Sequence, residues 1–262
     1  TPNHEDTTMS ATGIRFTKER QGIIPAIIKK YYDERRQIKN EMLKTQQVMQ
    51  KGSTKELEAK VNQLENQQMS IKILMNSLYG ALGNAGFRYF DNDVAEAITT
   101  SGQLSIRWAE KAINEEINNL LETLGEDYVI AIDTDSLYVN MKPLVGKFSP
   151  KDPSKFLDKI CKDHFEKILE KAYASLALRM NAYENRMEMS REVIADRGIW
   201  TAKKRYILNV WDSEGVRYEN PKLKVMGIEA VKSSTPAPCR QMLKDAFNKI
   251  MTETEDDVIE FI

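Results

Sequence analysis

Two long stretches with helical periodicity follow each other near the start of the chain, separated by a break of only a few residues. The first covers residues 23–49 and carries Pro25 in its first turn, where a helix tolerates proline. After the break at Lys51-Gly52-Ser53, Ser53 or Thr54 can cap a second helix over residues 55–82. Because so short a connection brings two long helices together antiparallel, we expect a helical hairpin.

Helical and strand-like segments both occur in the rest of the chain. Asp91-Asn92-Asp93 is interpreted as a turn and helix cap. The patterns then predict a helix over 93–124, a loop over 143–153, a helix over 154–182, strands over 186–227 with a turn at 212–215, and a last helix from Pro236 to the end. In the helix over 154–182, the candidate inward positions are Phe156, Ile160, Phe165, Leu169 and Tyr173.

Composition limits the classes of function. With 262 residues and 41% hydrophobic content, the chain can bury a sizeable core in one large or two smaller domains. Its formal net charge of -1 argues against a protein that coats nucleic acids, but residues 1–82 carry 13 basic against 9 acidic residues and residues 198–250 carry 10 against 5. We therefore expect any contact with nucleic acid to involve these two basic stretches. No 18-residue apolar run or cleavable leader is evident, so we expect a cytoplasmic protein without a membrane partner.

Two carboxylates lie one residue apart between short apolar runs. Asp133 and Asp135 occur in the segment 129–139, which reads as two strands joined by a turn, and such a turn would hold both side chains at one solvent-facing rim. Hard cations such as Mg²⁺ bind oxygen ligands placed in this way. The spacing alone is weak, because about one Asp-x-Asp is expected by chance in a chain of this length. A hairpin turn with two solvated acids is the alternative.

One face of the second long helix combines three kinds of side chain. Lys72, Asn76 and Tyr79 fall within one arc, opposite an apolar arc at residues 71, 74, 75, 78 and 82. They offer a cation for phosphate, an amide for hydrogen bonding and a ring on which a base can pack. Across the hairpin, Arg35 and Lys39 are spaced to face the same anion. The alternative is an ordinary solvated helix face.

A third basic element is Lys203-Lys204-Arg205-Tyr206, which we place within a strand. Alternation would then send Lys203 and Arg205 to one face, and Lys204 and Tyr206 to the other. One face can meet a phosphate backbone while the other reaches a groove or the protein interior. The alternative is a solvated edge strand protected against aggregation.

These three elements occur in one order: Lys72-Ile-Leu-Met-Asn-Ser-Leu-Tyr-Gly80, Asp133-Thr-Asp-Ser136 and Lys203-Lys-Arg-Tyr206. This set resembles family B DNA polymerases. The sequence around these motifs looks most like that of the replicative polymerases of T-even-like tailed bacteriophages. An example is Met226-Gly-Ile-Glu229 followed by Lys232-Ser-Ser-Thr-Pro236. The resemblance covers the chain from about Gly22 onward.

The resemblance implies an α+β fold: a polymerase palm, which is an antiparallel sheet with packed helices, with an inserted antiparallel two-helix fingers hairpin. Residues 1–21 would be a palm-edge segment, 22–83 the fingers, 84–235 the palm and 236–262 the start of the thumb. Asp135 resembles the principal metal ligand and Asp133 its partner. The residues resembling nucleotide-binding positions are Arg35, Lys39, Lys72, Asn76 and Tyr79; those resembling DNA-binding positions are Lys203, Lys204, Arg205 and Tyr206.

The implied reaction is attack of a primer 3′-hydroxyl on the α-phosphate of a dNTP, with two Mg²⁺ ions activating the nucleophile and stabilising the leaving pyrophosphate. Primer-template DNA and dNTP are therefore the implied partners. If the source is a phage, the compartment is the cytoplasm of an infected bacterium.

The chain departs from the family pattern in one major respect. The first carboxylate motif, an Asp followed by Ser-Leu-Tyr-Pro, is absent, as are a proofreading exonuclease motif and a full thumb. We therefore expect weak or no polymerisation by the chain alone and an N-terminal polymerase polypeptide as a partner. The alternatives are a non-catalytic nucleotide- and DNA-binding fragment and a helical scaffolding protein. Glu192 is either an accessory carboxylate or, as we prefer, a surface acid at a strand end.

Overall fold

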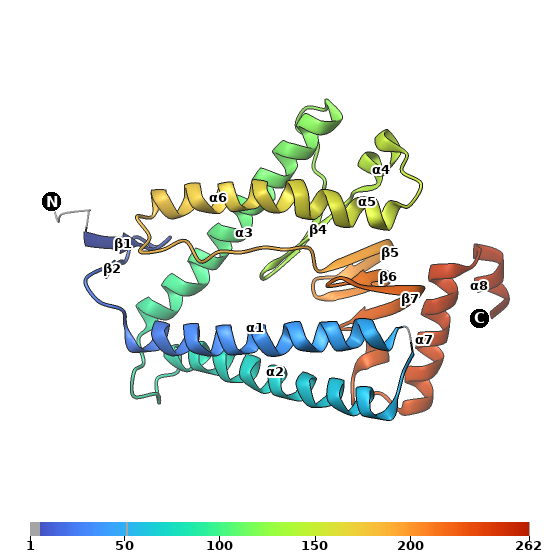
Figure 1. The fold of residues 1–262 in the computed structure, drawn as a ribbon, viewed down its shortest axis with the longest axis horizontal. Coiled ribbons are helices and arrows are strands. Elements are labelled where there is room, and N and C mark those ends of the chain that lie inside the picture. The colour runs from blue at the N-terminus through green and yellow to red at the C-terminus, as the bar shows by residue number, and fades with distance from the viewer. Residues whose placement is uncertain (1–5, 51, 262) are drawn as a thin grey trace. The chain divides into compact units, whose positions relative to one another are not determined.

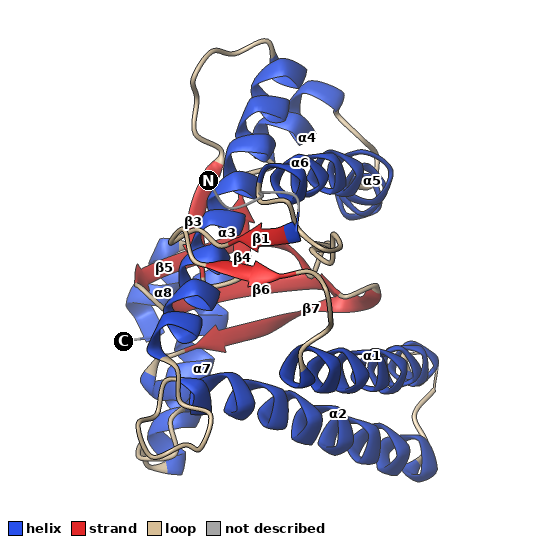
Figure 2. Ribbon diagram, turned by 90° about the vertical axis from the view of Figure 1, so that its left-hand side faces the viewer, coloured by secondary structure: helices blue, strands red, loops and turns tan. Residues whose placement is uncertain are grey.

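The computed structural model describes residues 6–50 and 52–261, so Lys51 of the predicted break and residues 1–5 and 262 of the predicted end segments lie outside the described part. The chain forms two compact units. One comprises residues 1–151 with 159–190, and the other comprises 152–158 with 191–262. Long helices and small antiparallel sheets (Figures 1 and 2) confirm the α+β class.

The predicted helical hairpin is present in the first unit. Helices α1 (Ile23–Met49) and α2 (Lys55–Leu82) lie side by side and run antiparallel (Figures 1 and 2). Thr54 caps α2, because its side chain accepts a hydrogen bond from the backbone N–H of Leu57 at 3.2 Å. The buried side chains of the hairpin include Met42 and Thr45 on α1 and Leu64 and Gln68 on α2.

The next helix, α3 (Asn92–Leu121), begins as predicted at an aspartate cap. The Asp91 carboxylate accepts a hydrogen bond from the N–H of Val94 at 3.0 Å. The helix ends three residues before the predicted Leu124, because Glu122 adopts a left-handed conformation with φ 60°. Lys147 stabilises this end by donating to the carbonyl oxygen of Leu120 at 2.9 Å.

The predicted single helix over 154–182 is instead three consecutive segments. They are α5 (Pro153–Ile160), a π-helical turn η2 (Cys161–Phe165) and α6 (Glu166–Arg179). A π-turn adds one residue to a helical turn, which apolar periodicity does not reveal. Of the predicted inward positions, Phe165, Leu169 and Tyr173 are buried against α3 in the core of the first unit, Ile160 packs against that core, and Phe156 is partly buried.

The loop predicted over 143–153 is wrong in its first half. Residues Lys142–Phe148 form the short helix α4, with Pro143 in its first turn and Leu144 fully buried in the core. The proline that we interpreted as a loop signal is in fact at a helix start, where its fixed φ is favourable.

Two small antiparallel sheets belong to the first unit. One pairs β1 (Thr7–Met9) with β2 (Arg15–Thr17), and the other pairs β3 (Val129–Asp133) with β4 (Ser136–Val139). The first sheet is anchored to the end of α6, because the N–H of Met9 donates to the carbonyl oxygen of Met180 at 2.9 Å.

The second unit contains a three-stranded antiparallel sheet in the order β5 (Val193–Ala202), β6 (Arg205–Ser213) and β7 (Val216–Met226). The predicted turn at 212–215 is real but shorter: Glu214 and Gly215 form it with φ values of 53° and 88°. Positive φ at both central residues is the backbone that a tight hairpin of twisted strands requires.

After the sheet come a 3₁₀ turn η3 (Glu229–Val231) and the helices α7 (Ala237–Thr252) and α8 (Glu255–Phe261). The single final helix predicted from Pro236 is therefore two helices, because Glu253 is extended and interrupts it. Met251 of α7 joins Ile207 and Ile228 in the core of this unit. Among residues 6–50 and 52–261, no helix is long and apolar enough to cross a membrane.

Candidate active site

The predicted hairpin carries both carboxylates of interest. Asp133 is the last residue of β3 and pairs with Ser136, the first residue of β4, so the connecting loop is Thr134 and Asp135 alone. Asp135 is exposed at the tip, and Asp133 is partly buried. The predicted strand-turn-strand is confirmed, and the placement of both carboxylates at one solvent-facing rim stays a prediction.

The tip of this hairpin is tightly hydrogen-bonded. The carbonyl oxygen of Asp133 accepts from the N–H of Asp135 at 2.7 Å and from the hydroxyl of Ser136 at 3.0 Å. The hydroxyl of Thr134 donates to the Asp133 carboxylate at 3.1 Å, and Thr134 itself is left-handed with φ 55°. These bonds fix the backbone that carries the two carboxylates.

A β-bulge in β3 decides which way Asp133 faces. Ile130 is an extra residue between the cross-strand pairs made by Val129 and Ala131. Val129 and Ile132 both pack in the core of the first unit. In a strand without a bulge, alternation from an inward Val129 would point Asp133 into that core as well. The bulge shifts the alternation by one residue, so Ile132 faces the core and Asp133 faces away from it.

This hairpin offers the type of ligand atom that a hard divalent cation prefers, but too few ligands to hold one alone. Asp133 and Asp135 supply carboxylate oxygens, which Mg²⁺ prefers. Within the described ranges, no group of three or more His, Cys, Asp or Glu side chains is arranged to hold a metal ion. The hairpin therefore contributes part of a ligand set, and further oxygen ligands would have to come from elsewhere.

The candidate nucleotide-binding residues lie on the two antiparallel helices. Lys72, Asn76 and Tyr79 are exposed on α2, as their predicted arc requires. Arg35 on α1 is partly buried, and its Nε donates to the buried side chain of Gln68 on α2 at 3.1 Å. Lys39 follows one turn later on the same helix and is also partly buried. The opposite arc is less buried than predicted, because Leu74 is 47% exposed.

Only the second half of the third element is in a strand, and the prediction is wrong for Lys203 and Lys204. Ala202 ends β5 and pairs with Arg205, the first residue of β6, so Lys203 and Lys204 form a two-residue turn. Lys204 has φ 63°, which cannot continue a strand, so the alternation predicted for its neighbours does not apply. Tyr206 is buried and packs near Trp200, with ring centroids 6.2 Å apart.

The segment after β7 folds back against this lysine turn. Gly227 has φ 67°, and a Cβ added to it would lie 2.1 Å from the carbonyl oxygen of Lys204. Two residues on, the Glu229 carboxylate accepts from Arg205 at 2.5 Å and from Lys232 at 3.0 Å. The hydrogen bond from Lys232, together with the charge of Arg205, lowers the pKa of Glu229 from its ordinary value. Arg205 is thus held by an ion pair between two half-exposed side chains.

Comparison with known proteins identifies the family. A family model described as DNA polymerase family B matches residues 2–262. The chain belongs to DNA polymerase family B. The DNA-directed DNA polymerases of Escherichia phage RB69 and Enterobacteria phage T4 are each 35% identical to it, over 94% and 96% of this chain. The DNA polymerase of Pyrococcus glycovorans is 28% identical over 95% of this chain.

This family B chain spans only part of the length of those relatives. The matched region makes up 33% of the RB69 protein, 34% of the T4 protein and 25% of the Pyrococcus glycovorans protein. The resemblance to T-even-like phage polymerases drawn from the motifs is confirmed by the two phage matches. The match does not assign roles to individual side chains.

Near Glu192, the family B chain contains a buried ion network that sequence reasoning missed. Arg191 is 6% exposed in its side chain and bonds the carboxylates of Asp158 and Asp212. Burial lowers the pKa of Arg191, but the hydrogen bonds and charges of the two aspartates raise it, and the net shift is upward. Glu192 is exposed and pairs with Lys224 at 3.3 Å, which agrees with a surface acid at a strand end.

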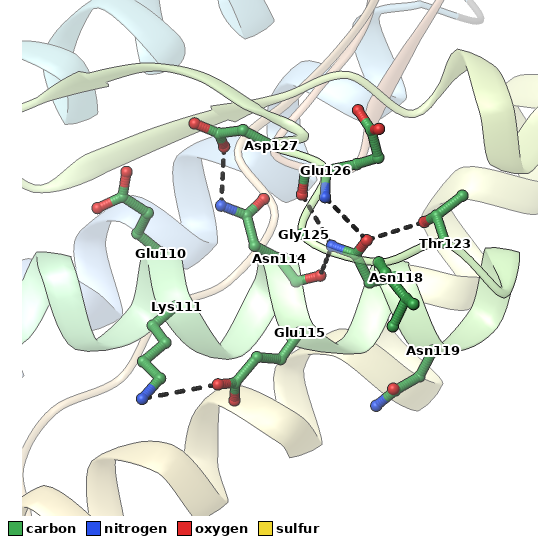
Figure 3. Close-up of a pocket in the computed structure, with 11 residues that line it drawn as sticks. Glu110, Lys111, Asn114, Glu115, Asn118, Asn119, Thr123, Gly125, Glu126 and Asp127 are labelled. Atoms are coloured by element: carbon green, nitrogen blue, oxygen red, sulfur yellow. Dashed lines mark hydrogen bonds and ion pairs between the residues drawn. The ribbon is translucent and has the colours of Figure 1, made fainter.

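A pocket beside the C-terminal end of α3 contains none of the predicted site residues of this family B chain (Figure 3). Its polar side chains bind each other and the loop before β3, notably those of Asn114, Asn118 and Asp127. No sequence signal pointed to these residues, because asparagine in a helix has no distinctive spacing and its partners lie up to 15 residues away.

Proposed function

We propose that this chain is the palm-and-fingers part of a template-directed DNA polymerase that transfers a nucleotide from a dNTP to a primer 3′-hydroxyl. The observation that carries the proposal is the DNA polymerase family B match over residues 2–262. The phage relatives, named as DNA-directed DNA polymerases, support DNA and nucleotide as substrates and the cytoplasm of an infected bacterium as the compartment.

In this proposal the β3–β4 hairpin is the metal-binding element. Asp133 and Asp135 would hold Mg²⁺ through their carboxylate oxygens, with Asp135 at the exposed tip as the principal ligand. Two such ions, when bound, would lower the pKa of the primer hydroxyl and neutralise the leaving pyrophosphate. The hydrogen bonds of the tip fix the backbone that carries both carboxylates, so metal binding would require little backbone rearrangement.

The hairpin of α1 and α2 is proposed as the fingers. Arg35, Lys39 and Lys72 would neutralise the triphosphate, Asn76 would hydrogen-bond it, and Tyr79 would pack at the nascent base pair. The exposure of Lys72, Asn76 and Tyr79 on one face of α2 supports this. Gln68 orients Arg35 through its side-chain bond, so the guanidinium does not rotate freely.

The turn between β5 and β6 is proposed as the DNA-backbone contact. Its tip places Lys203 and Lys204 where cations can reach phosphates. Arg205 and Tyr206 would support the turn rather than contact DNA, because Arg205 pairs with Glu229 and Tyr206 is buried. Residues 84–235 with the N-terminal segment 1–21 would then be palm, and residues 236–262 the start of a thumb.

The carboxylate set of this chain is incomplete for the proposed reaction. The Asp-Ser-Leu-Tyr-Pro motif does not occur in these 262 residues, and the relatives are about three times longer. We propose that polymerase sequence beyond these residues, joined to them or on a separate N-terminal polypeptide, supplies the missing carboxylate and the exonuclease. Without it, metal would be poorly held and the chain alone would extend primers weakly or not at all.

Primer extension in Mg²⁺ tests the proposal. The comparison is the chain alone, the chain with a polypeptide carrying the missing motif, and the same mixture with Asp135→Asn. We expect extension only in the unmodified mixture, and its loss with Asp135→Asn or on chelation by EDTA. Near-normal extension by the chain alone would show that its carboxylate set is complete. Full activity of the mixture with Asp135→Asn would overturn the metal-binding role of the hairpin.

The absent carboxylate motif also favours a second candidate, a non-catalytic nucleotide- and DNA-binding fragment. Such a fragment would bind primer-template DNA with salt-sensitive affinity but gain no activity from any partner. Absence of primer extension by the mixture, with the partner shown to bind, would establish this second candidate instead.

A further inference from the structure

The start of strand β3 is held by a side chain from a distant part of the sequence. The Oδ1 atom of Asn114 on α3 accepts hydrogen bonds from the N–H of Tyr128 at 2.9 Å and of Val129 at 3.2 Å. A two-stranded hairpin is only marginally stable by itself, so its placement depends on such outside contacts. This one bonds to the first two amides at the entry to the strand.

The orientation of Asn114 is itself fixed. Its Nδ2 donates to the carboxylate of Asp127 at 2.8 Å (Figure 3). The same Asp127 oxygen accepts from the N–H of Val129 at 3.1 Å. Because the amide nitrogen has an acceptor at Asp127, its oxygen must face the two backbone amides. Asn114 and Asp127 together form a clamp, which we name the β3 clamp.

The β3 clamp lies where the direction of the carboxylates is decided. With Val129 held in the core, the bulge at Ile130 leaves Asp133 facing away from that core. If the start of β3 slipped by one residue, every side chain of the strand would change face. A residue that fixes Val129 therefore also fixes the face on which Asp133 is presented, although it does not touch the carboxylate.

We propose that Asn114 is a positioning residue for the carboxylate hairpin, acting through the backbone of β3. The proposal rests on the function proposed above, in which Asp133 and Asp135 hold metal. Loss of the clamp frees the start of β3 and broadens the range of hairpin positions. The cation affinity of the two carboxylates then falls while the rest of the core of the first unit stays folded.

Asn118 provides a matched control on the same helix. It lies one turn after Asn114 and makes a comparable set of bonds, donating to the carbonyl of Glu126 at 2.8 Å and accepting from the N–H of Glu126 at 3.1 Å and the hydroxyl of Thr123 at 2.9 Å. None of these bonds reaches the amides of β3. A general loss of stability should follow from either asparagine, but a loss of hairpin position only from Asn114.

The experiment is Mn²⁺ titration of the chain followed by nuclear magnetic resonance. Paramagnetic broadening of the amides of residues 133–136 reports cation affinity at the hairpin, and methyl signals of Ile132 and Leu137 report its position. The variants are Asn114→Ala, Asn118→Ala and the double variant Asn114→Asp with Asp127→Asn. The double variant exchanges the amide and the carboxylate, so one side chain can still donate to the other. Circular dichroism confirms that each variant is folded.

We expect Asn114→Ala to weaken Mn²⁺ binding at the hairpin about tenfold, the low end for residues that orient metal ligands. The exchanged pair should recover most of this loss, and Asn118→Ala should leave the affinity unchanged. Equal affinities for Asn114→Ala and Asn118→Ala would overturn the proposal. If the unmodified hairpin binds no Mn²⁺ even with the polypeptide that carries the missing motif present, the metal role in the proposed function fails. The positioning role is then decided by whether Asn114→Ala alone shifts the Ile132 and Leu137 methyl signals; unshifted signals overturn it.

Discussion

Gly227 is the position where the backbone leaves the least room for a side chain. Its φ is 67°, and an added Cβ would meet the Lys204 carbonyl oxygen at 2.1 Å, well inside any real contact. Left-handed backbone costs a non-glycine residue about 1–2 kcal/mol. Here the clash adds to that cost, because the obstructing atom is backbone and cannot rotate away. The close approach to the lysine turn therefore requires a residue without a Cβ at position 227.

We predict that Gly227→Ala lowers the free energy of unfolding by about 3 kcal/mol or more, combining left-handed strain with overpacking. Gly215→Ala is the control, because Gly215 also has positive φ but no atom within 4 Å of an added Cβ. It should cost only about 1–2 kcal/mol. Urea unfolding measured by tryptophan fluorescence gives both values, and equal losses would contradict the close approach.

Arg191 is a buried cation between two aspartates, and its loss should be severe. Removing one partner of a buried ion pair leaves an uncompensated charge, so Arg191→Met should cost about 3–5 kcal/mol. Arg217 also lies near Asp212, at 3.6 Å, but is 39% exposed, so Arg217→Met should cost about 1 kcal/mol or less. Urea midpoints test this. Similar midpoints for the two variants would show that Arg191 is better hydrated than its burial indicates.

The candidate carboxylates were predictable from sequence, but the residues that support them were not. Asp133 and Asp135 lie next to each other in a local pattern that a turn explains. Asn114 and Gly227 act on segments 14 and 23 residues away, and nothing near them in sequence marks those contacts. A helical asparagine and a single glycine have many ordinary explanations, so only the fold reveals their partners.

At the scale of elements, the start of α2 depends on one hydroxyl. Thr54→Ala should lower the free energy of unfolding by about 1 kcal/mol, because the Leu57 N–H loses its acceptor at the helix start. Ser53→Ala is the control, since Ser53 binds the exposed Glu58 carboxylate at 2.6 Å and no backbone amide, and about 0.5 kcal/mol or less is expected. Hydrogen exchange at Leu57 should rise only in the first variant; a rise in both would contradict the cap assignment.

Elements with strong periodicity were predicted well, and the errors concentrate at their ends. The helices over 23–49 and 55–82 matched, with Pro25 in the first turn of one and the Thr54 cap at the start of the other. The helix at 142–148 was missed because proline starts helices as well as loops. The lysine turn was read as strand because lysine has no turn preference, and the close approach of Gly227 to the Lys204 carbonyl comes from outside the local sequence.

At the scale of the whole molecule, a net charge of -1 means that any DNA contact must come from local groups of cations rather than from overall attraction. We predict that Lys203→Ala and Lys204→Ala each reduce the slope of log affinity against log salt by about 1 for duplex DNA. Lys111→Ala, on an exposed residue of α3 paired with Glu115, should leave it unchanged. Fluorescence anisotropy of labelled primer-template at several salt concentrations measures these slopes. Unchanged slopes for both turn variants would remove the turn from the DNA interface.

Because of the bulge at Ile130, strand β3 contains one residue more than its pairing with β4 requires. Deleting Ile130 would join Val129 directly to Ala131, and the strand would alternate regularly with Val129 and Ile132 still inward and Asp133 still outward. Between the clamp and the hairpin tip, family members could therefore differ in length by this residue without reversing their carboxylates.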